Sequence, residues 1–247
     1  MMSPEGNTKN LNPGEGVRNA FWGWSRDEQK MYLMNNKRDP NFMDIYKLAI
    51  DSVEAEMPSG ELINQNNDGL DVGAISPNEK FFAITKAITS ADSRMFLFNK
   101  ETGEKTYISE HEGNATYSPQ FFSLDNANLY YTTDEGSDFV YLAKRNLNTG
   151  VVEKVFETNW DVWYAYDSWN EKYRVIGINK DAKTVVKVIN HETGQEVQLP
   201  KISGGSITSV NISKNEKFAC LMVSTSSTPS NMYVYNFETN ELTHIHI

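Results

Sequence analysis

Short apolar stretches alternate with polar, turn-forming segments along the whole chain. Between positions 71 and 108 the apolar stretches are Asp71–Ile75, Phe81–Thr85, Met95–Phe98 and Lys105–Ile108. Stretches this short, rich in aromatic and β-branched residues, are typical of β-strands. Because turn signals follow each other so closely, the pattern predicts an all-β fold rather than alternating strands and helices.

One turn motif recurs at a nearly constant spacing. It reads Ser, any residue, Asp or Asn, then Glu or Asn, and an aromatic-rich run follows it. The serines of its five copies lie 51, 47, 45 and 45 residues apart, at Ser25, Ser76, Ser123, Ser168 and Ser213. Ser, Asn and Asp favour turns because their side chains bond to nearby backbone, so each motif is expected to join two strands.

A second turn motif keeps the same period. It reads Asn-x-x-Thr and ends in Gly or Asn, residues that tolerate positive φ. Its four copies end 47, 44 and 46 residues apart, at Gly103, Gly150, Gly194 and Asn240, whereas the first repeat has a longer stretch over 51–60 instead. Two motifs with one period near 45 residues predict the four-stranded blade of a β-propeller.

The repeat predicts a single β-propeller domain over 1–247 with five four-stranded blades. The expected blades cover 17–66, 69–112, 115–158, 160–201 and 204–247, and residues 8–12 are expected to be a remnant strand of a preceding blade. A blade cannot bury both faces alone, so large aromatic residues are expected between blades. This is the interpretation for Trp22, Trp24, Trp160, Trp163 and Trp169, with ligand stacking as the alternative.

Charge and composition exclude several classes of partner. The formal net charge of −10 repels polyphosphate, so no nucleic-acid partner is expected. No apolar run approaches the ~18 residues that span a bilayer, so no membrane partner is expected either. The single cysteine, Cys220, excludes an internal disulfide but leaves the compartment, cytoplasmic or periplasmic, open.

No catalytic nucleophile stands out. Serine hydrolases of the α/β type carry Gly-x-Ser-x-Gly on a strand–turn–helix elbow. The nearest match, Gly204-Gly205-Ser206, lacks the second Gly and lies between expected strands, so we interpret it as a loop. Cys220 lies in an apolar stretch, where a packing role is expected. His111 and His191 fall in expected turns or loops.

The pair His244-x-His246 would point two imidazoles to one face of a strand. Such a pair supplies two ligands for zinc or nickel. No third ligand is identifiable, so we predict no metal site, no cofactor and no catalytic residue in this chain.

Three polar segments remain as candidates. Glu110-His111-Glu112 and the acids Asp134, Glu135 and Asp138 are interpreted as solvated loops, with capture of a peptide amino terminus as the alternative. Within Asn36–Pro40, Arg38 is expected to pair with Asp39 or to hold a neighbouring loop. The alternative for Arg38 is a domain interface or a substrate carboxylate.

The repeat resembles that of TolB-like propellers. More narrowly, Phe21–Gln29, Asn36–Pro40 and Asp44-Ile45-Tyr46 look like the propeller of bacterial prolyl oligopeptidase family serine peptidases. That resemblance implies a seven- or eight-bladed propeller that covers an α/β-hydrolase domain, filters peptide substrates and lends them contacts. With five repeats and no Gly-x-Ser-x-Gly, this chain is expected to be a fragment of such a protein.

Two other functions stay open. One is a stand-alone TolB-like propeller that serves as a platform for protein interactions. The other is a lyase or glycosidase, which needs convergent carboxylates; the candidates are Asp71, Asp161 and Asp167. Blades left uncovered at the ends of the array would be apolar, so the chain is expected either to close as a five-blade ring or to self-associate.

Overall fold

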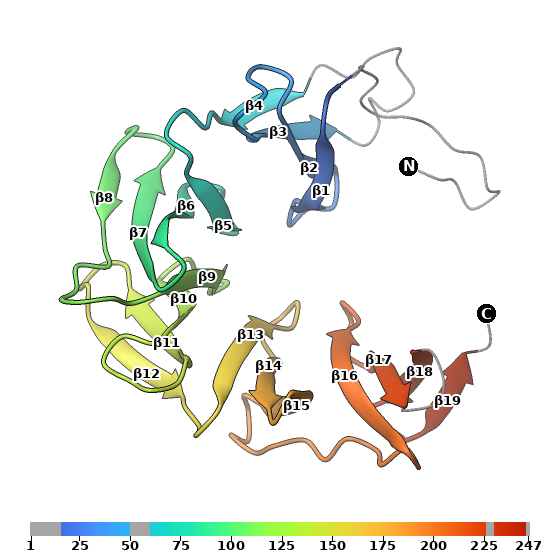
Figure 1. Cartoon of the computed structure of the whole chain (residues 1–247). Helices are drawn as coiled ribbons and strands as arrows, with labels where there is room; N and C mark the ends of the chain where they lie inside the picture. Colours follow the sequence, from blue (N-terminus) through green and yellow to red (C-terminus); the bar gives the residue numbers. More distant parts are fainter. Residues whose placement is uncertain (1–15, 50–59, 226–229, 246–247) are drawn as a thin grey trace. The chain divides into compact units, whose positions relative to one another are not determined.

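The computed structural model describes residues 16–49, 60–225 and 230–245. All regular elements in these ranges are β-strands, arranged in five antiparallel sheets that follow one another along the chain (Figure 1). This confirms the predicted fold class, an all-β propeller. The remnant strand expected over 8–12 lies outside the described residues. No described segment is a helix that could cross a membrane.

The chain divides into two compact units, residues 1–71 and 72–247. The first unit holds one sheet, with strands in chain order: β1 (Asn19–Trp24), β2 (Lys30–Asn35), β3 (Asp44–Ala49) and β4 (Glu61–Asn64). Its core forms from Met31, Leu33 and Leu48, with Tyr46 packed against them.

The second unit contains four sheets. The second sheet is β5 (Asp71–Ile75), β6 (Phe81–Thr89), β7 (Asp92–Asn99) and β8 (Lys105–Tyr107); the third is β9 (Tyr117–Phe122), β10 (Asn128–Thr133), β11 (Tyr141–Asn146) and β12 (Val152–Phe156). The fifth is β16 (Gly205–Ile212), β17 (Phe218–Thr225), β18 (Asn231–Asn236) and β19 (Leu242–Ile245).

The fourth sheet has three strands, β13 (Asp161–Asp167), β14 (Tyr173–Lys180) and β15 (Lys183–Asn190). A single bridge between Ile189 and Glu196 takes the place of the expected fourth strand. Pro200 follows four residues later and has no N–H to donate, which limits how far a ladder can extend.

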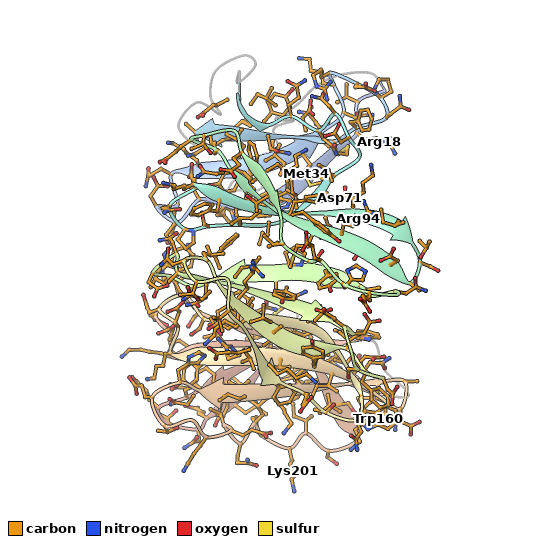
Figure 2. All side chains as sticks on the ribbon, turned by 90° about the vertical axis from the view of Figure 1, so that its left-hand side faces the viewer. Arg18, Met34, Asp71, Arg94, Trp160 and Lys201 are labelled. Carbon is orange, nitrogen blue, oxygen red and sulfur yellow. The ribbon has the colours of Figure 1, made fainter. Side chains whose placement is uncertain are left out.

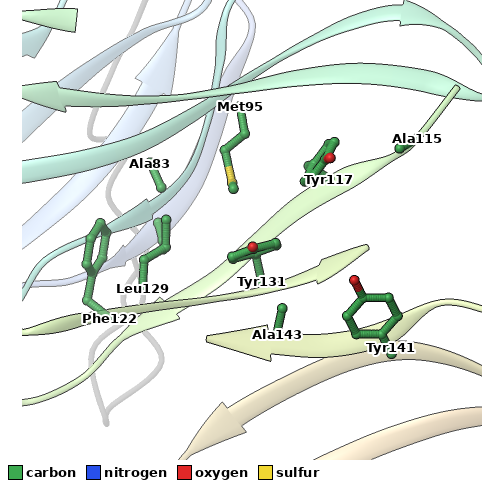
Figure 3. Close-up of a cluster of buried hydrophobic side chains, with 10 residues drawn as sticks. Ala83, Met95, Ala115, Tyr117, Phe122, Leu129, Tyr131, Tyr141 and Ala143 are labelled. Atoms are coloured by element: carbon green, nitrogen blue, oxygen red, sulfur yellow. The ribbon is translucent and has the colours of Figure 1, made fainter. Parts of the chain in front are cut away.

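Neighbouring sheets of the second unit share their cores because apolar side chains alternate between the two faces of each strand. In the third sheet, Leu129 and Tyr131 pack with Met95 of the second sheet (Figure 3). The intervening Tyr130 packs with Ile176 and Ile178 of the fourth sheet. The sheet is therefore apolar on both faces.

The Ser-x-(Asp/Asn) turns are closed by their own side chains. In the first copy the Ser25 hydroxyl donates to Asp27 Oδ1 (2.6 Å) and accepts the Lys30 N–H (3.0 Å). The fourth residue of every copy has positive φ, although none is glycine; φ is 60°, 58°, 62°, 60° and 58° at Glu28, Glu79, Asn126, Glu171 and Glu216. Its N–H donates to the serine carbonyl, which holds this uncommon conformation.

The left-handed residue also ties neighbouring turns together. Asn126 accepts the N–H of Asn78 (2.9 Å), and Glu171 accepts the N–H of Leu124 (2.5 Å). Each tie reaches the turn one repeat earlier. We call these contacts the turn ties.

The turn tie of Glu216 contains more hydrogen bonds than those of Asn126 and Glu171. Its Oε1 accepts the Asn170 N–H (2.7 Å) and the Ser168 hydroxyl (2.5 Å). Although it is a charged turn residue, Glu216 is only 7% exposed. Burial opposes its ionisation, but the hydrogen bonds from Ser168, Asn170 and Lys172 outweigh it and lower the pKa of Glu216.

We expect Glu216→Ala to lower the free energy of unfolding by about 1.5–3 kcal/mol, the range for hydrogen bonds to a charged group. Because the folded pKa is depressed, this contribution is present above the unfolded pKa, about 4.3, and is lost as the pH falls through the folded value. Urea unfolding at several pH values measures it. The exposed Glu192→Ala is the control; equal stability of the two variants would contradict the tie.

Candidate functional site

The loop between β10 and β11, residues 134–140, is the centre of the candidate site. Asp134 Oδ1 accepts both the N–H (2.7 Å) and the hydroxyl (3.0 Å) of Thr116, just before β9. At the other end of the loop, the Val140 N–H donates to Asp161 Oδ1 (3.0 Å), at the start of β13. The loop is thus fixed next to β9, the first strand of its own sheet, and to β13, the first strand of the fourth sheet. The side chains that it carries are therefore held in place.

His111 lies beside this loop, in the connection between β8 and β9. Its Nδ1 faces the Ser109 carbonyl (2.7 Å) and its Nε2 faces Asp92 Oδ1 (3.0 Å), and its side chain is only 6% exposed. Both partners accept hydrogen bonds, so both contacts are hydrogen bonds only when the ring is the doubly protonated imidazolium. The Ser109 carbonyl first, then Asp92 and the charge of Glu135, raise the pKa of His111 against its burial.

Tyr117 connects His111 with the acidic loop. Its ring centroid lies 5.3 Å from that of His111. Burial, followed by the Glu135 carboxylate, raises the pKa of Tyr117 well above its usual range. The Tyr141 hydroxyl donates to the Glu135 carbonyl (3.1 Å), which fixes the loop at this point.

Tertiary structure therefore brings together two acidic segments that no sequence pattern joins. Glu110, Glu112 and Asp138 are exposed, as expected for solvated loops. His111, Asp134 and Glu135 are not, since they hold the loops to the sheets. No periodicity or motif in the sequence pairs His111 with Glu135.

Exposed aromatic side chains border the same loop. Phe139 is 37% exposed, Trp160 (labelled in Figure 2) 38% and Trp163 57%. The prediction that the tryptophans pack between blades is wrong for Trp160 and Trp163, and for Trp24 in β1, which is 49% exposed. Trp22 and Trp169 are half-buried.

A β-bulge explains the exposure of Trp163. The register between β13 and β14 shifts between Val162 and Tyr164, which leaves Trp163 as the extra residue. Tyr164 then lies over Gly177: a Cβ there would stand 2.0 Å from the Tyr164 ring. Gly177 therefore permits the close approach that turns Trp163 outward. A similar shift in β1, between Phe21 and Gly23, precedes Trp24.

Other candidates from the sequence have structural roles. The interpretation of Gly204-Gly205-Ser206 as a loop is wrong for Ser206, which lies in strand β16 and pairs with Ser224 of β17. Cys220 lies in β17 but is half-buried rather than buried. His244 lies in β19, its ring 4.6 Å from that of Tyr233, while His246 is outside the described residues. The described ranges contain no group of three or more potential metal ligands.

Arg38 holds a neighbouring loop, one of the two structural roles foreseen for it. It donates to both oxygens of the buried Asp44 (2.7 and 2.9 Å) and to the Asn66 carbonyl (2.6 Å). Asp39, the other expected partner, instead accepts the Asn41 N–H (2.9 Å). Although burial opposes it, the Arg38 guanidinium lowers the pKa of Asp44, so the pair is ionised.

The carboxylates considered for a lyase or glycosidase do not converge within the second unit. Asp161 and Asp167 lie at opposite ends of β13, about 20 Å apart for an extended strand. Asp167 is held by Arg174 through two bonds of 2.7 Å. A glycosidase pair requires a much shorter separation.

Comparisons with known proteins agree on the fold. No family model matches the chain, and no curated protein matches it. Among solved structures, a putative TolB from Agrobacterium tumefaciens is 12% identical with a TM-score of 0.61, over 90% of this chain and 78% of the other.

Two peptidase structures are also similar. A structure from an analysis of two prolyl endopeptidases is 13% identical with a TM-score of 0.68, over 92% of this chain and 34% of the other. Prolyl oligopeptidase B from Galerina marginata is 14% identical with a TM-score of 0.64, over 90% and 33%. The chain has the fold of these propellers. It spans about a third of each peptidase, and identities this low establish the fold alone.

We expect the His111 contacts to make stability depend on pH. Because the folded pKa is raised, the contribution is complete below the unfolded value, about 6.5, and is lost as the pH rises through the folded value. In Asp92→Asn the side-chain amide can donate a hydrogen bond to Nε2 of the neutral His111 ring. The loss of stability with rising pH should therefore disappear. Urea unfolding below and above pH 6.5 measures this. A pH slope unchanged in Asp92→Asn would contradict the assignment.

Gly177→Ala should lower the free energy of unfolding by about 1–3 kcal/mol, because the new Cβ would overlap the Tyr164 ring. Thermal unfolding measures it. Gly23→Ala is the matched control, since it also lies in a strand but has open space around the added Cβ. Equal melting temperatures for the two variants would show that the position of the Tyr164 ring does not depend on the missing side chain at Gly177.

Proposed function

We propose that this chain is the non-catalytic propeller of a prolyl oligopeptidase-like serine peptidase, where it filters peptide substrates and lends them contacts. Two observations support the proposal: the segments within Phe21–Tyr46 that resemble the family, and the fold shared with the prolyl endopeptidase structure. The partner implied is an α/β-hydrolase domain that carries the nucleophile. The chain itself has no Gly-x-Ser-x-Gly segment.

The loop at 134–140 supplies the contacts that a peptide requires. Glu135 and Asp138 provide negative charge for a peptide amino terminus, and the net charge of −10 attracts cations toward the surface. Phe139, Trp160 and Trp163 offer exposed rings for side-chain packing. Because the loop is fixed at Asp134 and Val140, little ordering is required when a ligand binds.

The alternative is a TolB-like platform for folded protein partners. The fold shared with TolB supports this function equally. The same exposed aromatic residues would then bind a protein surface, since Trp and Tyr are enriched at such interfaces. The two functions differ in whether a short peptide is sufficient as the ligand.

Tryptophan fluorescence titration with a short proline-containing peptide distinguishes them. We expect the chain to bind the peptide without cleaving it, and Trp163→Ala to weaken binding about 3- to 10-fold, the value of one aromatic contact. Acetylation of the peptide amino terminus should weaken binding by a similar factor, because it removes the charge. Leu124→Ala, an exposed residue of another turn, is the control.

Binding that is equal for Trp163→Ala, Leu124→Ala and the unaltered chain would overturn the assignment of this loop. No binding of any peptide would favour the platform function instead. Cleavage of the peptide by the purified chain would overturn the non-catalytic assignment.

A further inference from the structure

Trp163 lies between two contacts that join the backbone of β13 to the third sheet. Before it, the Val162 N–H donates to the Val140 carbonyl (2.9 Å). After it, the Ala165 N–H donates to Oε1 of Gln120 in β9 (3.1 Å). Because β13 is the first strand of its sheet, N–H groups that face away from β14 can be satisfied only from outside that sheet. The bulge at Trp163 is therefore held at both of its ends by the third sheet.

Gln120 is itself the extra residue of a bulge. In the pairing of β9 with β10, Phe121 lies opposite Tyr130. The next residue of β10, Tyr131, lies opposite Pro119, so Gln120 has no direct partner in the ladder. A bulge of this kind changes the direction of the side chain that it carries. The bulge in β9 thus allows the Gln120 side chain to reach β13.

The orientation of the Gln120 amide is fixed by its own sheet. Nε2 donates to the Ser118 carbonyl (3.1 Å) and lies within hydrogen-bond distance of the Ser118 hydroxyl (3.2 Å) and the Thr132 hydroxyl (3.3 Å). An amide nitrogen only donates and an amide oxygen only accepts. These acceptors around the nitrogen therefore leave the oxygen to face the Ala165 N–H.

Pro119 fixes the same part of β9 against the second sheet. Pro119 is buried, and a Cβ added to Gly73 of β5 would lie 3.0 Å from its Cβ. The two strands approach this closely because Gly73 has no side chain. Gln120 therefore extends toward the fourth sheet from a strand that the second sheet supports.

We propose that Gln120 is a positioning residue of the candidate peptide site, and that its hydrogen bond to Ala165 holds the β13 bulge in the form that exposes Trp163. The effect on peptide binding rests on the proposed function, whereas the effect on Trp163 does not. The position requires an acceptor for the Ala165 N–H and a donor for the Ser118 carbonyl. Methionine has a similar length but provides neither group.

The indole N–H signal of Trp163 in the nitrogen–proton NMR spectrum reports its position without any ligand. It is identified as the indole signal that Trp163→Ala removes. We expect Gln120→Met to shift or broaden this signal, because the bulge loses one of its two contacts. Gln198→Met, at an exposed position outside the site, is the matched control and should leave the signal unchanged. A Trp163 signal that Gln120→Met does not alter would overturn the proposal.

Titration with the proline-containing peptide tests whether Gln120 acts through Trp163. We expect Gln120→Met to weaken binding about 3- to 10-fold, like Trp163→Ala. The double variant should bind no more weakly than Trp163→Ala alone, since the contribution of Gln120 requires the Trp163 ring. Losses that add in the double variant would overturn the proposal. If the unaltered chain binds no peptide, the proposed function fails, and the indole signal still decides the role of Gln120.

Circular dichroism checks that each variant folds. If Gln120→Met does not fold, amide hydrogen exchange of the unaltered chain decides instead. The Ala165 N–H should exchange slowly, because the Gln120 oxygen accepts it. Exchange of the Ala165 N–H as fast as that of an exposed loop amide would show that the contact does not hold the bulge, and would overturn the proposal.

Discussion

The third and fourth sheets are apolar on both faces, and the packing of the second unit depends on that constraint. A strand sends successive side chains to opposite faces, so a sheet with apolar residues at both sets of positions requires two neighbours. In β14, Tyr173 and Val175 pack toward the fifth sheet, while Ile176 and Ile178 pack toward the third. The hydrophobic effect thus stacks the sheets in chain order, with no helix needed to cover them.

Polar turns fix the register that hydrophobic packing alone leaves loose. The left-handed residue of each Ser-x-(Asp/Asn) turn is strained in conformation, and at Asn126, Glu171 and Glu216 it places its side chain at the preceding turn. Arg174 acts similarly within the sheets: it pairs with Asp167 and lies 4.4 Å from the Tyr130 ring. Each interface therefore combines an apolar core with directional contacts that determine how the sheets align.

The candidate site depends on departures from this regular pattern. The bulge in β13 turns the Trp163 ring away from the sheet. The loop at 134–140 carries carboxylates and is held between β9 and β13. Bulges and loops are where a repetitive scaffold places side chains for binding, because packing does not dictate their identity. His111, in the connection between β8 and β9, is held by the Ser109 carbonyl and by Asp92 of the second sheet, and its ring lies against Tyr117 of the third sheet.

The sequence alone predicts the strands, both turn motifs and the blade-like repeat, because these follow from local preferences of the backbone and from the alternation of side chains. It did not determine that Trp163 is exposed, since the bulge depends on how Tyr164 meets Gly177 on another strand. Nor did it show that Glu216 is buried or that His111 pairs with Asp92. Those contacts join residues far apart in the chain, and they form only when the strands pair and the sheets stack.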